Sequence, residues 1–140
     1  MLPISVALIC TVLLLISMGF FMLGSLPLLV LKHDTPLDSC FIRGLFSVYY
    51  LAVIWVAGAT ASSYAWAQKP AVALGAAAYS ALAFALRRWI MIPRMDALRW
   101  TIQATDHAAI SRFRLLHIAG MLLNAAQLGT AAWALTQLGL

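Results

Sequence analysis

The sequence predicts an all-α, polytopic membrane protein with four transmembrane helices in an antiparallel bundle. First, 64% of its 140 residues are hydrophobic and 9% are charged, whereas soluble domains carry about 25% charged residues. Second, four long apolar segments approach the length of about 20 residues that a helix needs to cross a bilayer. Third, eight of the nine basic residues lie on one side of these segments, which is the charge asymmetry of an inserted protein.

We expect one domain over residues 1–140, because short loops between four spans leave no room for a catalytic module outside the membrane. The first apolar run has no basic residue before it and exceeds the roughly 7–15 residues of a signal-peptide core, so we interpret it as the first helix. The predicted spans are approximately 2–31, 41–67, 70–93 and 112–138.

The connection after the first span contains a helix-breaking signal and a capping signal. Thr35 precedes Pro36, and the residue before a proline disfavours helix. A break is therefore expected near Thr35, with Asp38 or Ser39 as the N-cap of the second helix.

Small residues recur on the second and third helices. Gly58 and Ser62 are four residues apart, as are Ala77, Ala81 and Ala85. Such stripes allow helix backbones to approach closely in lipid, where hydrophobicity alone gives no force for association. These faces are therefore predicted to pack against other helices.

The third span is followed by the largest polar segment. Pro93 is predicted to kink or end the helix. Residues 94–111 are expected to form a short interfacial helix or a cytoplasmic extension of the third span. Asp106 is predicted to cap the last helix.

The distribution of charge predicts the orientation of the chain. In a four-span protein the first and third loops share one side, and this side holds every basic residue except Lys69. The positive-inside rule places that side in the cytoplasm and both termini in the periplasm of a bacterial inner membrane. Because insertion topology explains the net charge of +5, no nucleic-acid partner is expected.

The last span carries one polar stripe. His117, Gly120, Asn124 and Gln127 follow a spacing of three, four and three residues, which places them on one helix face. Amides exposed to lipid would lack hydrogen-bond partners, so this seam should face protein. We interpret it as structural, with Asn124 and Gln127 bonding across helices; the alternative is a pocket for a headgroup, a quinone carbonyl or another ligand.

Two histidines and a group of charged residues are candidates for binding. His33 and His117 lie near the cytoplasmic ends of their helices, and two neutral imidazoles can ligate haem b or stand beside a quinone. No Cys, His and carboxylate cluster has metal-ligand spacing, so no metal site is expected. The candidate cluster for ion pairs, or for the anionic headgroup of a phospholipid or quinol, comprises Arg43, Arg87, Arg88, Arg94, Arg114, Asp34 and Asp38.

Aromatic residues mark the expected membrane interfaces. Tyr64 and Trp66 are predicted in the outer aromatic belt, whereas Tyr50 and Trp55 lie deeper and are expected in the core or against a ligand.

The run Arg112-Phe113-Arg114-Leu115-Leu116-His117, followed by Leu122-Leu123-Asn124 and Gln127-Leu128, resembles the last helix of a family of small bacterial integral membrane proteins. That family is known as a four-helix domain of unknown function. Ile92-Pro93-Arg94-Met95-Asp96 is similar to the end of its third helix. The resemblance implies a four-helix membrane bundle.

The sequence gives no sign of catalysis, since no nucleophile has a recognisable base partner and there is no glycine-rich phosphate loop. We expect a non-catalytic accessory or assembly subunit of a larger membrane complex, which packs against other subunits or against itself and is surrounded by anionic phospholipids. The alternative is a haem- or quinone-binding redox protein that uses His33 and His117.

Overall fold

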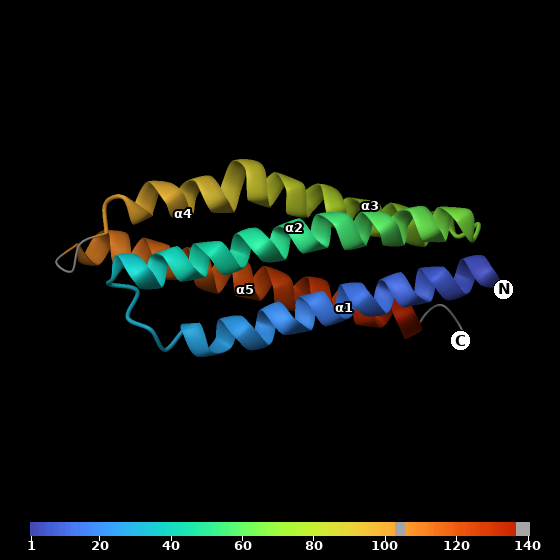
Figure 1. Ribbon diagram of the computed structural model, residues 1–140, viewed down its shortest axis with the longest axis horizontal. Coiled ribbons are helices and arrows are strands. Elements are labelled where there is room, and N and C mark those ends of the chain that lie inside the picture. The colour runs from blue at the N-terminus through green and yellow to red at the C-terminus, as the bar shows by residue number, and fades with distance from the viewer. Residues whose placement is uncertain (103–105, 137–140) are drawn as a thin grey trace.

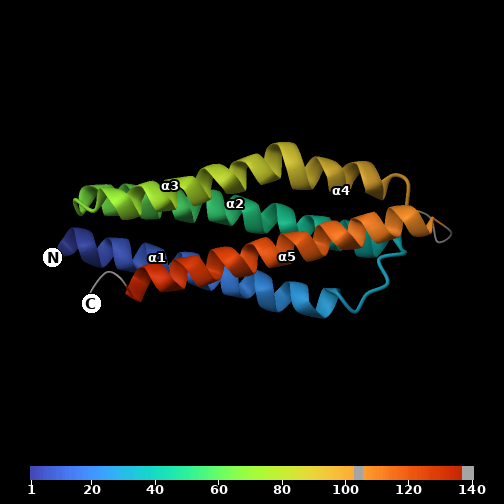
Figure 2. The same ribbon diagram turned by 180° about the vertical axis from the view of Figure 1, so that it is seen from behind.

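The computed structural model describes residues 1–102 and 106–136, and these form a bundle of long antiparallel helices (Figures 1 and 2). Four helical stretches are long and apolar enough to cross a membrane, as predicted, so the chain is a multi-pass membrane protein. The start of α1, the end of α5 and the α2–α3 turn lie at one end of the bundle, and the ends of α1 and α4 lie at the opposite end with the starts of α2 and α5. The stretches are Leu2–Leu28, Pro36–Trp66, Pro70–Arg99 and His107–Thr136.

Helix α1, Leu2–Leu28, ends with a tightened turn at Pro27, where the following amides bond to carbonyls three residues back. Helix α2, Pro36–Trp66, begins earlier than expected. Asp38 and Ser39 do not cap it, because Thr35 is the N-cap and its hydroxyl accepts a hydrogen bond from the Asp38 N–H at 3.1 Å. Pro36 then occupies the first turn, where its missing N–H is not needed.

The third span is longer than predicted, because Pro93 does not end it. Helix α3, Pro70–Ala85, passes into a π-helical turn, η1, Leu86–Ile90, and then into α4, Met91–Arg99. In this turn the Met91 N–H bonds to the Leu86 carbonyl, five residues back. The change in hydrogen-bond register comes directly before the proline, which has no N–H to give to the helix. The polar segment thus begins as an extension of the third span.

Helix α5, His107–Thr136, begins earlier than the predicted residue 112. Asp106 caps it as predicted, and its carboxylate accepts the Ala109 N–H at 3.0 Å. The described part of the last span ends at Thr136, so residues 137–138 of the prediction lie outside the described residues.

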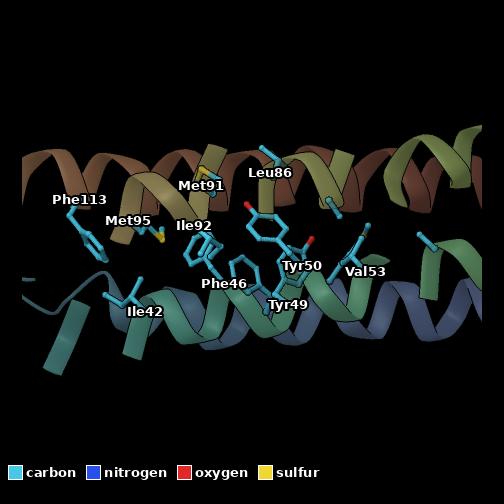
Figure 3. Packing of buried hydrophobic residues seen from close by; sticks show 14 of the residues in the cluster. Ile42, Phe46, Tyr49, Tyr50, Val53, Leu86, Met91, Ile92, Met95 and Phe113 are labelled. Atoms are coloured by element: carbon cyan, nitrogen blue, oxygen red, sulfur yellow. The ribbon is translucent and has the colours of Figure 1, made fainter. Parts of the chain in front are cut away.

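The core contains a group of aromatic side chains, part of which Figure 3 shows between α2 and the helices that face it. Phe46 on α2 packs edge-on against Phe21 of α1, with ring centroids 4.9 Å apart, and Tyr49 stacks on the same Phe21 ring at 4.0 Å. Met91 and Met95 of α4 cover the other side of this group. The aromatic rings therefore join three helices.

Gly120 allows α5 to approach this core closely. A Cβ atom at this position would overlap Phe46 Cε1, and it would lie 2.7 Å from Phe46 Cζ and 3.0 Å from Met91 Cε. Phe46 is fully buried, so its ring has no free space into which it can move. Only glycine therefore fits between α5 and this ring.

We expect Gly120→Ala to destabilise the protein by about 1–3 kcal/mol, the usual cost of overfilling a packed core. The check is thermal unfolding in mild detergent. Gly129→Ala is the matched control, because a Cβ there meets nothing within 4 Å. Equal melting temperatures for the two variants would contradict the close packing, and Phe46→Leu should restore part of the loss in Gly120→Ala.

Candidate functional site

The structure brings His33 and His117 together in the interior. His33 lies in the α1–α2 connection with a positive φ of 61°, an uncommon conformation for a residue with a side chain. His117 projects from α5. His33 Nε2 and His117 Nδ1 are 3.0 Å apart and share a hydrogen bond, and both side chains are fully buried. Residues 84 positions apart are thus joined near the α1–α2 connection.

The second nitrogen of each ring has no hydrogen-bond partner among the residues that the structure describes. These atoms are His33 Nδ1 and His117 Nε2. Phe46 covers the His117 ring edge-on, with centroids 5.6 Å apart, and Phe113 lies 6.3 Å from the His33 ring. A buried polar atom without a partner is costly, so the pair is a candidate site for protons or a ligand.

Burial lowers the pKa of His33 below its ordinary value of 6.5. The Arg114 guanidinium acts in the same direction, whereas the Leu31 backbone, Asp38 and Asp34 favour the protonated form. The removal of the imidazole from solvent outweighs these groups, because burial penalises the charged form. Folding therefore favours the neutral form of the His33 ring.

The polar seam of α5 also lies in the interior. Gly120, Asn124 and Gln127 are buried with His117. Asn124 Nδ2 donates to the Met18 carbonyl of α1 at 3.2 Å, and the Tyr49 hydroxyl of α2 donates to Asn124 Oδ1. Asn124 thus links three helices. For Gln127 the structure shows a contact at the backbone, whose carbonyl accepts a long hydrogen bond of 3.4 Å from Tyr79.

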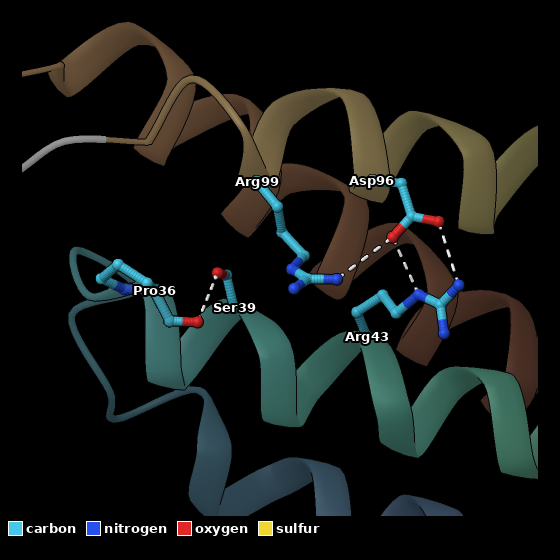
Figure 4. Close-up of polar contacts among 5 residues, drawn as sticks. All are labelled: Pro36, Ser39, Arg43, Asp96 and Arg99. Atoms are coloured by element: carbon cyan, nitrogen blue, oxygen red, sulfur yellow. Dashed lines mark hydrogen bonds and ion pairs between the residues drawn. The ribbon is translucent and has the colours of Figure 1, made fainter.

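The candidate cluster of charged residues is not assembled as a unit in the described part of the chain. Arg43 makes a bidentate pair with Asp96 of α4, with nitrogen–oxygen distances of 2.8 and 3.0 Å, and Arg99 joins the same carboxylate at 3.3 Å (Figure 4). The partner of Arg43 is therefore Asp96 rather than Asp34 or Asp38. This triad fixes α4 on α2.

The other arginines of the cluster are dispersed. Arg87 Nε donates to the Ser47 carbonyl at 3.4 Å, and Arg114 donates to the Leu29 carbonyl at 3.2 Å. Arg88 and Arg94 are exposed. A headgroup site built from the whole set therefore has no common centre in the structure.

Two aromatic side chains lie differently from the predictions. Tyr64 is not in the outer belt, because its side chain is buried and its hydroxyl bonds to Thr11 of α1 at 3.1 Å. Trp55 is not in the core, since it is 71% exposed on the outer surface of α2. Tyr50 is buried as expected. Whether each of these side chains is buried depends on the face of α2 from which it projects. Its position along the span, on which the predictions relied, does not identify that face.

The sequence interpretation missed Tyr49, Asp96 and Thr11 as partners of polar groups. Tyr49 was the most accessible to inference, because Asn124 needs a partner in the membrane and Tyr49 is one of few residues on α2 that can donate a hydrogen bond at that depth. Asp96 was available as an acidic partner for Arg87 or Arg88, but its pairing with Arg43 was not predicted. The helical extension of the third span, which brings Asp96 beside Arg43, was one of the two predicted forms of the polar segment.

No protein-family model, no curated protein and no solved structure matches this chain. The resemblance to the four-helix membrane family therefore stays a prediction, and the chemistry of the site is argued from its own geometry.

Acid should destabilise the protein through His33. Its pKa is lowered on folding, so the unfolded chain binds more protons below about pH 6.5 and stability falls as the pH drops below that value. The measurement is the melting temperature in detergent between pH 8 and pH 5. His33→Asn, which tolerates the positive φ, should show a smaller acid-induced decrease; an unchanged pH dependence in this variant would contradict a neutral buried pair.

Proposed function

We propose that this protein is a non-catalytic subunit that assembles with another integral membrane protein by helix packing. Its polar groups support this proposal, because most of them bond within the bundle: Asn124 to α1 and α2, and Arg43 to α4. Side chains that already bond to neighbouring helices of the same chain are not free to bond to a partner protein. The surface available for a partner is therefore the outward face.

The observation that carries the proposal is a groove of small residues on the outer face of α2 and α3. The groove has a volume of about 620 Å³. Ala77 and Ala81 of α3 are exposed in it, and Gly58 of α2 is half-buried opposite them. Phe84 and Trp89, packed edge-on with centroids 5.5 Å apart, form one wall.

The occupant that fits this groove is a transmembrane helix of a partner protein. Its lining carries no charged side chain, and its alanines and glycine let another backbone come close. The Ser80 hydroxyl on its floor already donates to the Ile54 carbonyl at 2.8 Å. A lipid chain gains little from such a surface over bulk lipid, whereas a helix ridge gains close van der Waals contacts.

The proposal also includes the orientation of the chain and the membrane in which it lies. The end of the bundle that holds the α1–α2 and α4–α5 connections faces the cytoplasm, and both termini face the periplasm of a bacterial inner membrane. The positive-inside rule and the clustering of the arginines at one end support it.

The test is blue-native electrophoresis of mild-detergent membrane extracts. We expect a species larger than a single chain that contains a second membrane protein. Ala81→Leu should reduce its abundance about tenfold, because an added side chain in a packed interface costs about 1–3 kcal/mol. Ala126→Leu, on the exposed side of α5, should leave it unchanged. A single chain alone, a species made only of this chain, or equal effects of the two substitutions would reject the proposal.

A second candidate function, haem or quinone binding, is favoured by the buried His33–His117 pair. The two rings contact each other, and each has a nitrogen without a hydrogen-bond partner among the described residues. Their direct bond of 3.0 Å means that iron would have to separate the imidazoles, so this candidate ranks second.

A visible absorption spectrum of the purified protein tests the haem form. A Soret band that shifts with dithionite and disappears in His117→Ala would establish it. Absence of the band before and after reduction would reject it, and mass spectrometry of extracted lipids would decide the quinone form.

A further inference from the structure

A second cavity, the α3–α5 cavity, lies between the start of α3 and the last turns of α5. It has a volume of about 500 Å³, within the range of about 300–1,000 Å³ typical of ligand sites. Residues of α1, α2, α3 and α5 line it, and most of them are apolar. On α3 the lining runs from Ala71 to Tyr79, which is about 12 Å along the helix axis.

Gly75 shows that this hollow has unfilled space beside α3. It lines the cavity, and a Cβ atom at this position would meet no heavy atom within 4 Å. Gly120 is the opposite case, since a Cβ there overlaps Phe46. The lack of a side chain at Gly75 is therefore not required by neighbouring protein atoms, and it leaves room for another molecule.

The polar atoms of the lining are occupied. The Thr11, Thr60 and Thr130 hydroxyls donate to carbonyls of their own helices at 2.8, 2.8 and 2.7 Å. The Tyr64 hydroxyl bonds to Thr11 at 3.1 Å, and Tyr79 donates to the Gln127 carbonyl. A ligand that needs a hydrogen bond from these hydroxyls would have to break the existing bonds, whereas a hydrocarbon chain leaves all of them intact. The cavity thus suits a chain without polar groups.

The charge near the open end of the cavity indicates which headgroup the bound molecule carries. Lys69 directly precedes α3 and stands two residues before Ala71, which lines the cavity. The other eight basic residues lie in the α1–α2 connection, early in α2, in η1 and α4, and early in α5. An anionic headgroup at this end therefore has Lys69 as its nearby basic side chain, which attracts it by about 1 kcal/mol.

We propose that the α3–α5 cavity holds one acyl chain of an anionic phospholipid, with the phosphate beside Lys69. The bilayer supplies this molecule directly, since the cavity lies within the membrane-spanning part of all four lining helices. This site is separate from the groove between α2 and α3, so the two proposals fail independently.

The test is native mass spectrometry of the delipidated protein supplied with phosphatidylglycerol or with phosphatidylcholine. We expect one phosphatidylglycerol to stay bound, about fivefold more than phosphatidylcholine. Gly75→Leu should lose the lipid, because its side chain starts in the cavity, where a Cβ atom meets no heavy atom within 4 Å. Gly129→Leu is the matched control: its site is equally open but does not line the cavity, so the lipid should be retained.

Lys69→Gln should abolish the preference for phosphatidylglycerol while the chain still binds. Retention of lipid by Gly75→Leu, or equal binding of the two lipids by the wild-type protein, would overturn the proposal.

Photocrosslinking of the wild-type protein with phosphatidylglycerol carrying a photoreactive acyl chain tests the site without any substitution. Labels on peptides of α3 and α5 that line the cavity are expected, and labels spread evenly around the bundle would also overturn it.

Discussion

Helix α5 is joined to the rest of the bundle by hydrogen bonds made inside the membrane, and the arrangement of the other helices depends on them. In lipid the hydrophobic effect does not drive helices together, so close packing and polar contacts must do so. Asn124 supplies both a donor to α1 and an acceptor to α2, and Gly120 brings the α5 backbone against Phe46. His117 adds the α1–α2 connection through His33. One helix face therefore organises three other parts of the chain.

The sequence was sufficient for the number of spans, because length and hydropathy are local properties, and all four are confirmed. It was also sufficient to identify the α5 stripe as a set, since helical spacing places its members on one face. The sequence did not identify Thr35 as the N-cap of α2, because Thr, Asp and Ser are all good caps and only the backbone geometry selects one. It left open whether Pro93 kinks or ends the helix, because a π turn upstream is not visible in residue types, and the helix continues through Pro93 to bring Asp96 beside Arg43.

Helix α3 is held differently from the other three spans. Its buried residues are Ala73, Ala76 and Ala83, with no large side chain among them. One flank borders the small-residue groove and the other borders the cavity facing α5. A helix that fills little of the interior has both sides free for other molecules, which is why the two proposed interactions, a protein helix and a lipid chain, both involve α3. The α4 continuation is fixed more firmly by its ion pairs (Figure 4).

The position of His117 and Asn124 on the last helix has a consequence for biogenesis. A chain made from its N-terminus inserts α1, α2 and α3 before α5 has left the ribosome. During that interval Tyr49, the Met18 carbonyl and His33 lack the partners that they have in the finished fold. The early hairpins can form through their own contacts, yet their interior stays incomplete until α5 packs against them. A fragment of this fold without α5 would therefore leave the Tyr49 hydroxyl and the His33 ring without the partners that they have here.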